Sequence, residues 1–151
     1  MKVIKLLTLS LLLINTAAQA ETVDPAKAGE MTVYRSPSCS CCGRWLEHVQ
    51  KNNFIIKDIV TDEVQAIKDK YGVSADMASC HTAVIGGYVI EGHVPAQDIV
   101  ALLTNKPAVT GISVPGMPVG TPGMEMGAKK DAYQVVSFDR SKHYQVFNSY
   151  K

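Results

Sequence analysis

Four cysteines are the residues of this chain best suited to chemistry. Three lie in the tetrapeptide Cys39-Ser40-Cys41-Cys42, and the fourth, Cys80, is followed directly by His81. Thiolates attack disulfides and bind soft metals, so a dense cluster of this kind indicates redox chemistry or metal binding. Further candidate donors are the imidazoles of His81 and His93 and the thioether of Met117. Thiolate, imidazole and thioether together form the donor set that copper(I) selects.

The cysteine spacing leaves three alternatives to copper open. Cys39 and Cys42 form a C-x-x-C pair, as in a thiol–disulfide oxidoreductase, although the adjacent Cys41 would invite mispairing. A structural zinc ion takes four tetrahedral ligands, usually from two spaced pairs, and adjacent cysteines converge poorly on one ion. Cysteines of exported proteins also form structural disulfides, here Cys39–Cys42 and Cys41–Cys80. The local crowding favours a cluster in which thiolates bridge several copper(I) ions.

The histidines and methionines have simpler interpretations beside ligation. His81 and His93 could instead cap a helix or bond to the backbone. The methionines of the proline- and glycine-rich loop 114–127 could provide adaptable packing, and Met117, between Gly116 and Pro118, is the strongest ligand candidate among them. The remaining histidines and loop methionines are predicted to lie at the surface, in a turn or in packing contacts: His48, His143, Met124 and Met126.

The first twenty residues are typical of a cleaved secretory signal peptide. Lys2 and Lys5 precede an apolar run over 6–14, and Ala18-Gln19-Ala20 is a small-x-small cleavage site. The run is too short for a membrane span. We therefore expect cleavage after Ala20 and export to a bacterial periplasm, rather than an uncleaved anchor helix.

Composition and length limit the remaining classes of protein. Lysine and arginine number 15 against 14 aspartate and glutamate residues, so no basic surface for nucleic acid or anionic membrane is expected. The length after cleavage suits one domain. We expect a flexible segment over 21–29 and a single domain over 30–151, divided into a core at 30–106 and a loop-and-hairpin appendage at 107–151.

Hydrophobic periodicity and turn residues predict an α/β protein. The expected elements are a strand at 31–34, a helix at 42–51, a strand at 54–60, a helix capped by Thr61 or Asp62 and ended by Gly72, a hairpin of 83–85 with 88–90, and a helix with Pro95 in its first turn. This order is the thioredoxin-like arrangement, with a cysteine motif between the first strand and the first helix. Two strands, 133–138 and 144–148, are expected to form a hairpin that packs on the domain.

This arrangement has consequences for the thiols. A helix N-terminus favours anions, so it should lower the pKa of Cys39, Cys41 and Cys42, which aids both metal binding and disulfide exchange. The fold would also bring Cys80 beside the cluster. Thioredoxin-like exchangers place a cis-proline before the third strand, whereas this chain has Ser79-Cys80-His81-Thr82 there. The missing proline favours metal binding over exchange.

Four segments in order resemble the CopG family of periplasmic copper-resistance proteins, long described as a metal-binding domain of unknown function. The segments are Cys39-Ser40-Cys41-Cys42, Ser79-Cys80-His81-Thr82-Ala83, Ile90-Glu91-Gly92-His93-Val94-Pro95-Ala96 and Val114-Pro115-Gly116-Met117-Pro118. The resemblance spans about residues 31–124. It implies a thioredoxin-like fold, a cysteine-bridged copper site and a role in copper tolerance.

We therefore predict a periplasmic copper(I)-binding protein of copper resistance or homeostasis. Its predicted metal ligands are Cys39, Cys41, Cys42, Cys80, His81, His93 and Met117. Its expected partners are copper ions and other periplasmic copper-handling proteins, with no nucleic acid. One hypothesis is that the multinuclear site cycles between copper(I) and copper(II), which would make the protein a copper oxidoreductase. The alternative function is thiol–disulfide exchange through Cys39 and Cys42.

Overall fold

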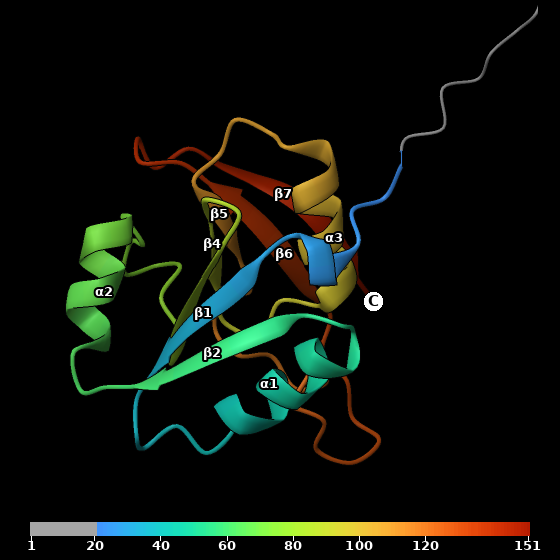
Figure 1. Cartoon of the computed structure of the whole chain (residues 1–151). Coiled ribbons are helices and arrows are strands. Elements are labelled where there is room, and N and C mark those ends of the chain that lie inside the picture. Colours follow the sequence, from blue (N-terminus) through green and yellow to red (C-terminus); the bar gives the residue numbers. More distant parts are fainter. Residues whose placement is uncertain (1–20) are drawn as a thin grey trace, which may run out of the picture.

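The computed structural model describes residues 21–151, which form one sheet and three α-helices (Figure 1). The predicted signal peptide, residues 1–20, lies outside the described residues. In chain order the elements are a 3₁₀ turn (Pro25–Lys27), β1 (Glu30–Arg35), α1 (Cys42–Lys51), β2 (Ile55–Val60), α2 (Val64–Tyr71), β3 (His81–Ile85), β4 (Tyr88–Glu91), α3 (Ala96–Asn105), β5 (Gly111–Ser113), β6 (Tyr133–Phe138) and β7 (Tyr144–Tyr150). The predicted α/β class is confirmed.

The sheet has seven strands in the order β2-β1-β3-β4-β5-β6-β7. β1 runs parallel to β2 and antiparallel to β3, and β3 and β4 form the predicted hairpin. β4 is parallel to β5, and the remaining neighbours are antiparallel. Because strand residues alternate between faces, Met31 and Val33 of β1 point into the same core. The cysteine motif lies in the turn after β1, at one end of the central strands.

Helices cover both faces of the sheet (Figure 1). One face carries α1 and α3, whose inward residues share a core with β1, β3 and β4: Trp45, Leu46, Val49, Ile99, Leu102 and Leu103. The other face carries α2 and the chain that follows it, where Val73 and Met77 pack with Val89 and Phe138. None of the helices within residues 21–151 has the length and apolar character needed to cross a bilayer.

The predicted helices are present, with small differences at their starts. α1 has the predicted bounds, and α2 ends where Gly72 adopts the left-handed conformation, with φ of 74°. The predicted caps of α2 were wrong, because Glu63 is the N-cap and the Thr61 hydroxyl accepts the Glu63 N–H at 3.1 Å in the preceding turn. Pro95 lies at the N-cap of α3 rather than inside its first turn.

The segment 107–151 extends the sheet. The short strand β5 was not predicted, and it joins β6 and β7 to β4. Its first residue, Gly111, lies so close to Val89 that an added Cβ would overlap the Val89 backbone. Close backbone approach therefore explains both the glycine and the weak sequence signal for a strand. The loop 114–132 leaves the sheet and passes beside α1 (orange in Figure 1).

Candidate metal centre

The cysteine motif lies where the turn after β1 enters α1. The Cys39 N–H donates to the Ser36 carbonyl at 3.1 Å, which closes the turn. Cys41 is the N-cap of α1, its side chain makes no capping bond, and Cys42 is the first helical residue. The sulfur of Cys41 is therefore free to face the site at the N-terminal end of α1.

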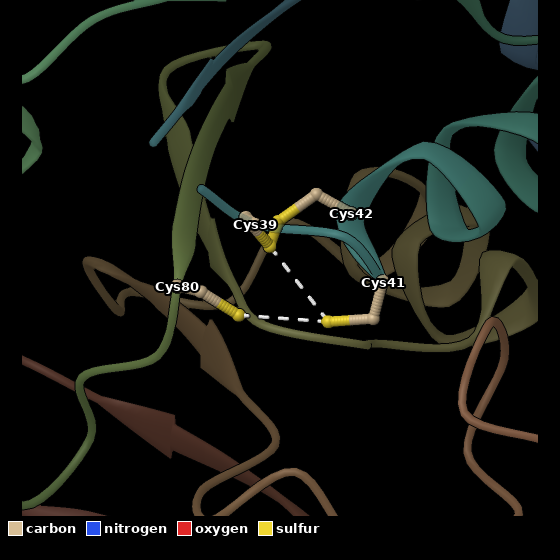
Figure 2. A group of neighbouring side chains, drawn as sticks. All are labelled: Cys39, Cys41, Cys42 and Cys80. Atoms are coloured by element: carbon tan, nitrogen blue, oxygen red, sulfur yellow. Dashed lines mark hydrogen bonds between the residues drawn. A yellow bond between two sulfur atoms is a disulfide. The ribbon is translucent and has the colours of Figure 1, made fainter. Parts of the chain in front are cut away.

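The four cysteine sulfurs converge, although two of them are bonded to each other (Figure 2). Cys39 and Cys42 form a disulfide, while Cys41 and Cys80 are thiols. The Cys41 sulfur lies 3.7 Å from that of Cys39 and 3.8 Å from that of Cys80. Of the two disulfides in the structural-disulfide alternative, Cys39–Cys42 is therefore present, whereas Cys41 and Cys80 are in contact but not bonded. All four sulfurs lie within 4.8 Å of one another.

Cys80 is the residue just before β3, and its side chain points into the site. Its thiol is partly buried, and burial together with the nearby Cys41 raises its pKa to about 11. The unmetallated thiol is therefore protonated at neutral pH, and a soft cation would have to displace its proton. The Cys80 sulfur also lies 3.2 Å from the Met117 sulfur, so the methionine loop reaches the cluster.

Two buried histidines lie behind the thiols. His81 and His93 are fully buried, and their rings meet edge to face with centroids 5.3 Å apart. The Nδ1 of His81 lies 3.4 Å from the Cys42 sulfur, whereas the Nδ1 of His93 donates to the Pro122 carbonyl at 2.7 Å. Within residues 21–151, the Nε2 atoms of both have no hydrogen-bond partner. Buried polar atoms without partners are rare, which marks these nitrogens as candidate ligands.

The state of these imidazoles also suits metal binding. Burial lowers the pKa of both His81 and His93, and for His81 the neighbouring His93 and Lys68 lower it further. Both rings are therefore neutral at pH 7, the form that binds metals. Each offers a ligand atom within 4.8 Å of the other and of the Cys80 sulfur.

The methionine loop is fixed against the start of α1. Gly123 has φ of +83°, and a Cβ there would lie 2.7 Å from the backbone nitrogen of Trp45. The Trp45 indole donates to the Val94 carbonyl at 2.9 Å and packs on His81, with ring centroids 4.4 Å apart. Met117 itself has φ of +48° and is 38% exposed. The loop thus places one thioether at the boundary between the cluster and solvent.

Comparison with known proteins agrees with this geometry. Two solved structures, titled copper resistance protein CopG form 2 and form 1, are 46% and 47% identical to the chain, with TM-scores of 0.76 and 0.75. Form 2 matches 81% of this chain and 98% of its own, and form 1 matches 80% and 96%. The chain belongs to the CopG family. Residues 77–124 also match a family model described as protein of unknown function, DUF411, and no curated protein matches.

The predicted ligands of this CopG family member lie together in space. The four cysteines form one group, and Cys80, His81 and His93 form a second that shares Cys80 with the first. Met117 adjoins both through Cys80. Their convergence supports the predicted set, while ligation itself stays a prediction.

The other two histidines lie outside the cluster, and His48, predicted to lie at the surface, is instead half-buried between two helices. The Nε2 of His48 accepts the Ala96 N–H at 3.0 Å, which links α1 to the first turn of α3. Burial lowers the pKa of His48, in keeping with its role as a neutral acceptor. His143 pairs with Asp139 at 2.9 Å in the exposed turn between β6 and β7.

Sequence reasoning missed the ion pair beside the site. The Lys68 ammonium lies 2.6 Å from a Glu91 carboxylate oxygen, and both side chains are at least 96% buried. A signal was present, because Lys68 follows Val64 by four residues and so occupies the inward face of α2. A lysine on an apolar helical face indicates a buried partner, although the sequence alone does not say which carboxylate it meets.

Proposed function

We propose that this CopG family member binds copper(I) in the periplasm through a cysteine-bridged multinuclear site, and that it serves copper resistance by sequestering or relaying the metal. The convergence of four sulfurs within 4.8 Å carries the proposal. Two neutral imidazoles, whose Nε2 atoms have no partner among residues 21–151, and one thioether complete a donor set suited to copper. The order of elements and the cysteine motif at the start of α1 also support a thioredoxin-like scaffold.

Reduction of the Cys39–Cys42 disulfide would prepare the site. Two electrons and two protons from a thiol reductant convert the disulfide to two thiols, and the four cysteines can then lose their protons to copper(I). Thiolates can bridge metal ions, whereas thioethers carry no charge and bridge poorly. We assign Cys39, Cys41, Cys42 and Cys80 as bridging ligands and His81, His93 and Met117 as terminal ones.

The direct test is a metal count. The reduced protein is loaded with copper(I) without oxygen, freed of excess metal, and analysed for copper and thiols per chain. We expect more than one copper per chain when all four thiols are reduced, and much less when the Cys39–Cys42 disulfide is kept. Less than one copper per fully reduced chain would exclude the proposed site.

Cys80→Ser tests the bridging role assigned to Cys80. A hydroxyl does not replace a thiolate toward copper(I), so the copper count should fall, with a small change in melting temperature because Cys80 is only partly buried. Met117→Leu is the matched control, since it removes a terminal donor at nearly constant volume. Equal copper in Cys80→Ser and wild type would remove Cys80 from the site.

Redox cycling of the bound copper is part of the proposal. Thiolates favour copper(I), and the imidazoles of His81 and His93 also accept copper(II). Mild oxidation of the loaded protein, followed by electron paramagnetic resonance, should give a copper(II) signal that a reductant removes. Release of copper with irreversible disulfide formation would argue for storage alone.

The periplasmic location depends on the predicted signal peptide at residues 1–20. The mass of the protein recovered from the periplasm of a bacterial host should correspond to a chain that begins at Glu21. Recovery of the uncleaved chain in the membrane fraction would contradict the proposed location.

Thiol–disulfide exchange is a second candidate, favoured by the Cys39–Cys42 disulfide and by the Cys41 sulfur 3.7 Å from it. In this reaction a substrate dithiol would transfer two electrons to the disulfide through a mixed disulfide, and the substrate would leave oxidised. Exchange activity near that of a dedicated oxidoreductase, lost in Cys39→Ser and insensitive to a copper chelator, would favour this function.

A further inference from the structure

The buried Lys68–Glu91 pair lies directly against the segment that carries Cys80. Both oxygens of the Glu91 carboxylate are occupied. One oxygen accepts from Lys68 at 2.6 Å and from the Ser79 N–H and hydroxyl at 2.6 and 2.8 Å, and the other accepts from the Thr82 hydroxyl at 2.6 Å. Lys68 also donates to Thr82 at 2.8 Å. One carboxylate thus holds the residues on both sides of the Cys80-His81 dipeptide.

Glu91 cannot itself bind the metal proposed above in this arrangement. Its neighbour across the strands is Thr82, and both contact Lys68 from α2. The adjacent residue His81 points to the opposite face, where it packs on Trp45 of α1. Because side chains alternate along a strand, the Glu91 network and the imidazoles lie on opposite faces of the sheet. Any effect of Glu91 on the site must therefore pass through the chain it holds.

The backbone beside Glu91 connects the remaining parts of the site. The Gly92 N–H donates to the His81 carbonyl at 3.3 Å, and the Glu91 carbonyl accepts the Val114 N–H at 3.1 Å, where the methionine loop begins. Gly92 has φ of +75°, and a Cβ there would lie 3.0 Å from the Val114 oxygen and 3.1 Å from the Ser79 Cβ. Glu91-Gly92 is therefore the point where the Cys80 segment and the methionine loop meet.

We propose that Glu91, held by Lys68, is a positioning residue that fixes Cys80 opposite Cys41 through its bonds to Ser79. This inference rests on the proposed copper function, and it adds a role for two residues that bind no metal. The carboxylate restrains the turn before β3, which has no proline to stiffen it. Outer groups that orient ligands typically change metal affinity by about 10–100-fold when removed.

The main test replaces the ion pair as a unit. The double variant Glu91→Leu/Lys68→Met has similar volume and no buried charge, and such replacements are often neutral or stabilising. It removes the acceptor for Ser79. We expect a folded protein that binds copper(I) at least about tenfold more weakly than wild type, measured by competition with a copper(I) chelator.

A cycle with Cys80→Ser distinguishes positioning from a general structural role. If Glu91 acts through Cys80, adding Cys80→Ser to the double variant should weaken copper(I) binding little further, whereas adding it to the wild-type protein should weaken binding clearly. Full additivity of the two changes, or wild-type copper affinity in the double variant, would overturn the inference.

Asp98→Asn is the matched control. Asp98 is a buried carboxylate that accepts from Tyr150 at 2.6 Å and from Asn148 at 2.7 Å. Its variant should lose stability while keeping copper affinity. Copper binding that follows the melting temperature across this variant and the double variant alike would show that Glu91 serves stability only.

Ser79→Ala provides a test that does not require the protein to fold with both Glu91 and Lys68 replaced. It removes the hydroxyl bond to Glu91 together with the contacts of that hydroxyl with the His81 carbonyl and N–H, and it leaves the ion pair intact. We expect weaker copper binding by several-fold and slower formation of a Cys41–Cys80 disulfide with a metal-free oxidant, which takes two electrons and two protons from the thiols. Unchanged copper affinity and an unchanged rate would contradict the inference.

The disulfide rate keeps the two proposals separable, because it needs no copper. Wild-type protein that binds no copper(I), but whose disulfide rate falls in the Ser79→Ala and double variants, would refute the copper function and retain the positioning of Cys80. If wild type binds copper(I) and both variants bind it equally strongly, the copper function is retained and the positioning role of Glu91 is refuted.

Discussion

The buried polar groups next to the Cys80-His81 dipeptide differ between the two faces of the sheet. On the α2 face, the oxygens of Glu91 are filled by hydrogen bonds, and Lys68 is paired and buried. On the α1 face, His81 and His93 are just as buried, yet each leaves one nitrogen without a partner in the part of the chain that the structure describes. The α2 side is a completed hydrogen-bond network, whereas the α1 side offers free donor atoms to the copper site proposed above.

This contrast separates two uses of buried polar groups. A satisfied network holds its surroundings in one arrangement, while an unsatisfied group costs stability and is retained where it serves function. Substitutions should therefore behave differently on the two faces. Single changes that leave a charge of the α2-face network unpaired should destabilise the protein, and changes on the α1 face should alter copper binding at little cost to stability.

The largest effect on stability is expected for Lys68→Met. This change leaves the Glu91 carboxylate buried without its counter-charge, and breaking a buried pair in this way typically costs about 3–5 kcal/mol. Urea unfolding of the metal-free protein measures the loss. The matched double variant Glu91→Leu/Lys68→Met should recover most of it. A loss below about 1 kcal/mol in Lys68→Met would show that the two faces do not differ as described.

An intermediate effect is expected for His81→Phe and should depend on pH. Burial lowers the pKa of His81 well below its ordinary value, so the folded state keeps the ring neutral while the unfolded state binds a proton below about pH 6.5. The unfolded state then binds more protons, and stability falls as the pH falls, by up to about 1.4 kcal/mol per pH unit for each such histidine.

His81→Phe should therefore flatten this dependence. Between pH 7.5 and 5.5, the unfolding free energy of the metal-free variant should fall less steeply than that of wild type, by about one histidine's share. At pH 7.5 the variant should be nearly as stable as wild type, because an apolar ring replaces an imidazole whose Nε2 has no partner within the described residues. It should also bind less copper. An unchanged slope would show that His81 is protonated in the folded protein.

The smallest effect is expected for Met117→Leu. Its sulfur contacts Cys80, but it is a neutral donor on a partly exposed loop. The copper count and the stability should stay at wild-type levels, and affinity should fall by a few-fold at most. A lower copper count in Met117→Leu would mean that the loop completes the cluster and does more than cover it.

The elements around the cysteine motif could be predicted from local signals. The apolar stripe of Trp45, Leu46 and Val49 predicted α1. Gly72 marked the end of α2, because glycine adopts the left-handed conformation of a helix C-terminus without steric cost. β5 could not be predicted, since three residues beginning with Gly111 carry little strand propensity and depend on the neighbouring β4.

The ligand candidates were equally visible in the sequence, because their chemistry is a property of residue type. The order of elements predicted that Cys80 lies beside the other cysteines, and its sulfur lies 3.8 Å from that of Cys41. The Lys68–Glu91 pair was not visible, since partners 23 positions apart meet only through the packing of α2 on β4. Contacts of this kind depend on tertiary structure, for which a single sequence holds no local pattern.

The packing of Trp45 on His81 gives the protein a built-in optical probe. Trp45 is the only tryptophan in the sequence, and its ring centroid lies 4.4 Å from that of the imidazole. Any proton or metal ion that adds charge to His81 changes the electrostatic field at the indole. The intrinsic fluorescence of the unlabelled protein should therefore follow occupancy of the site during a titration, with no background from a second indole.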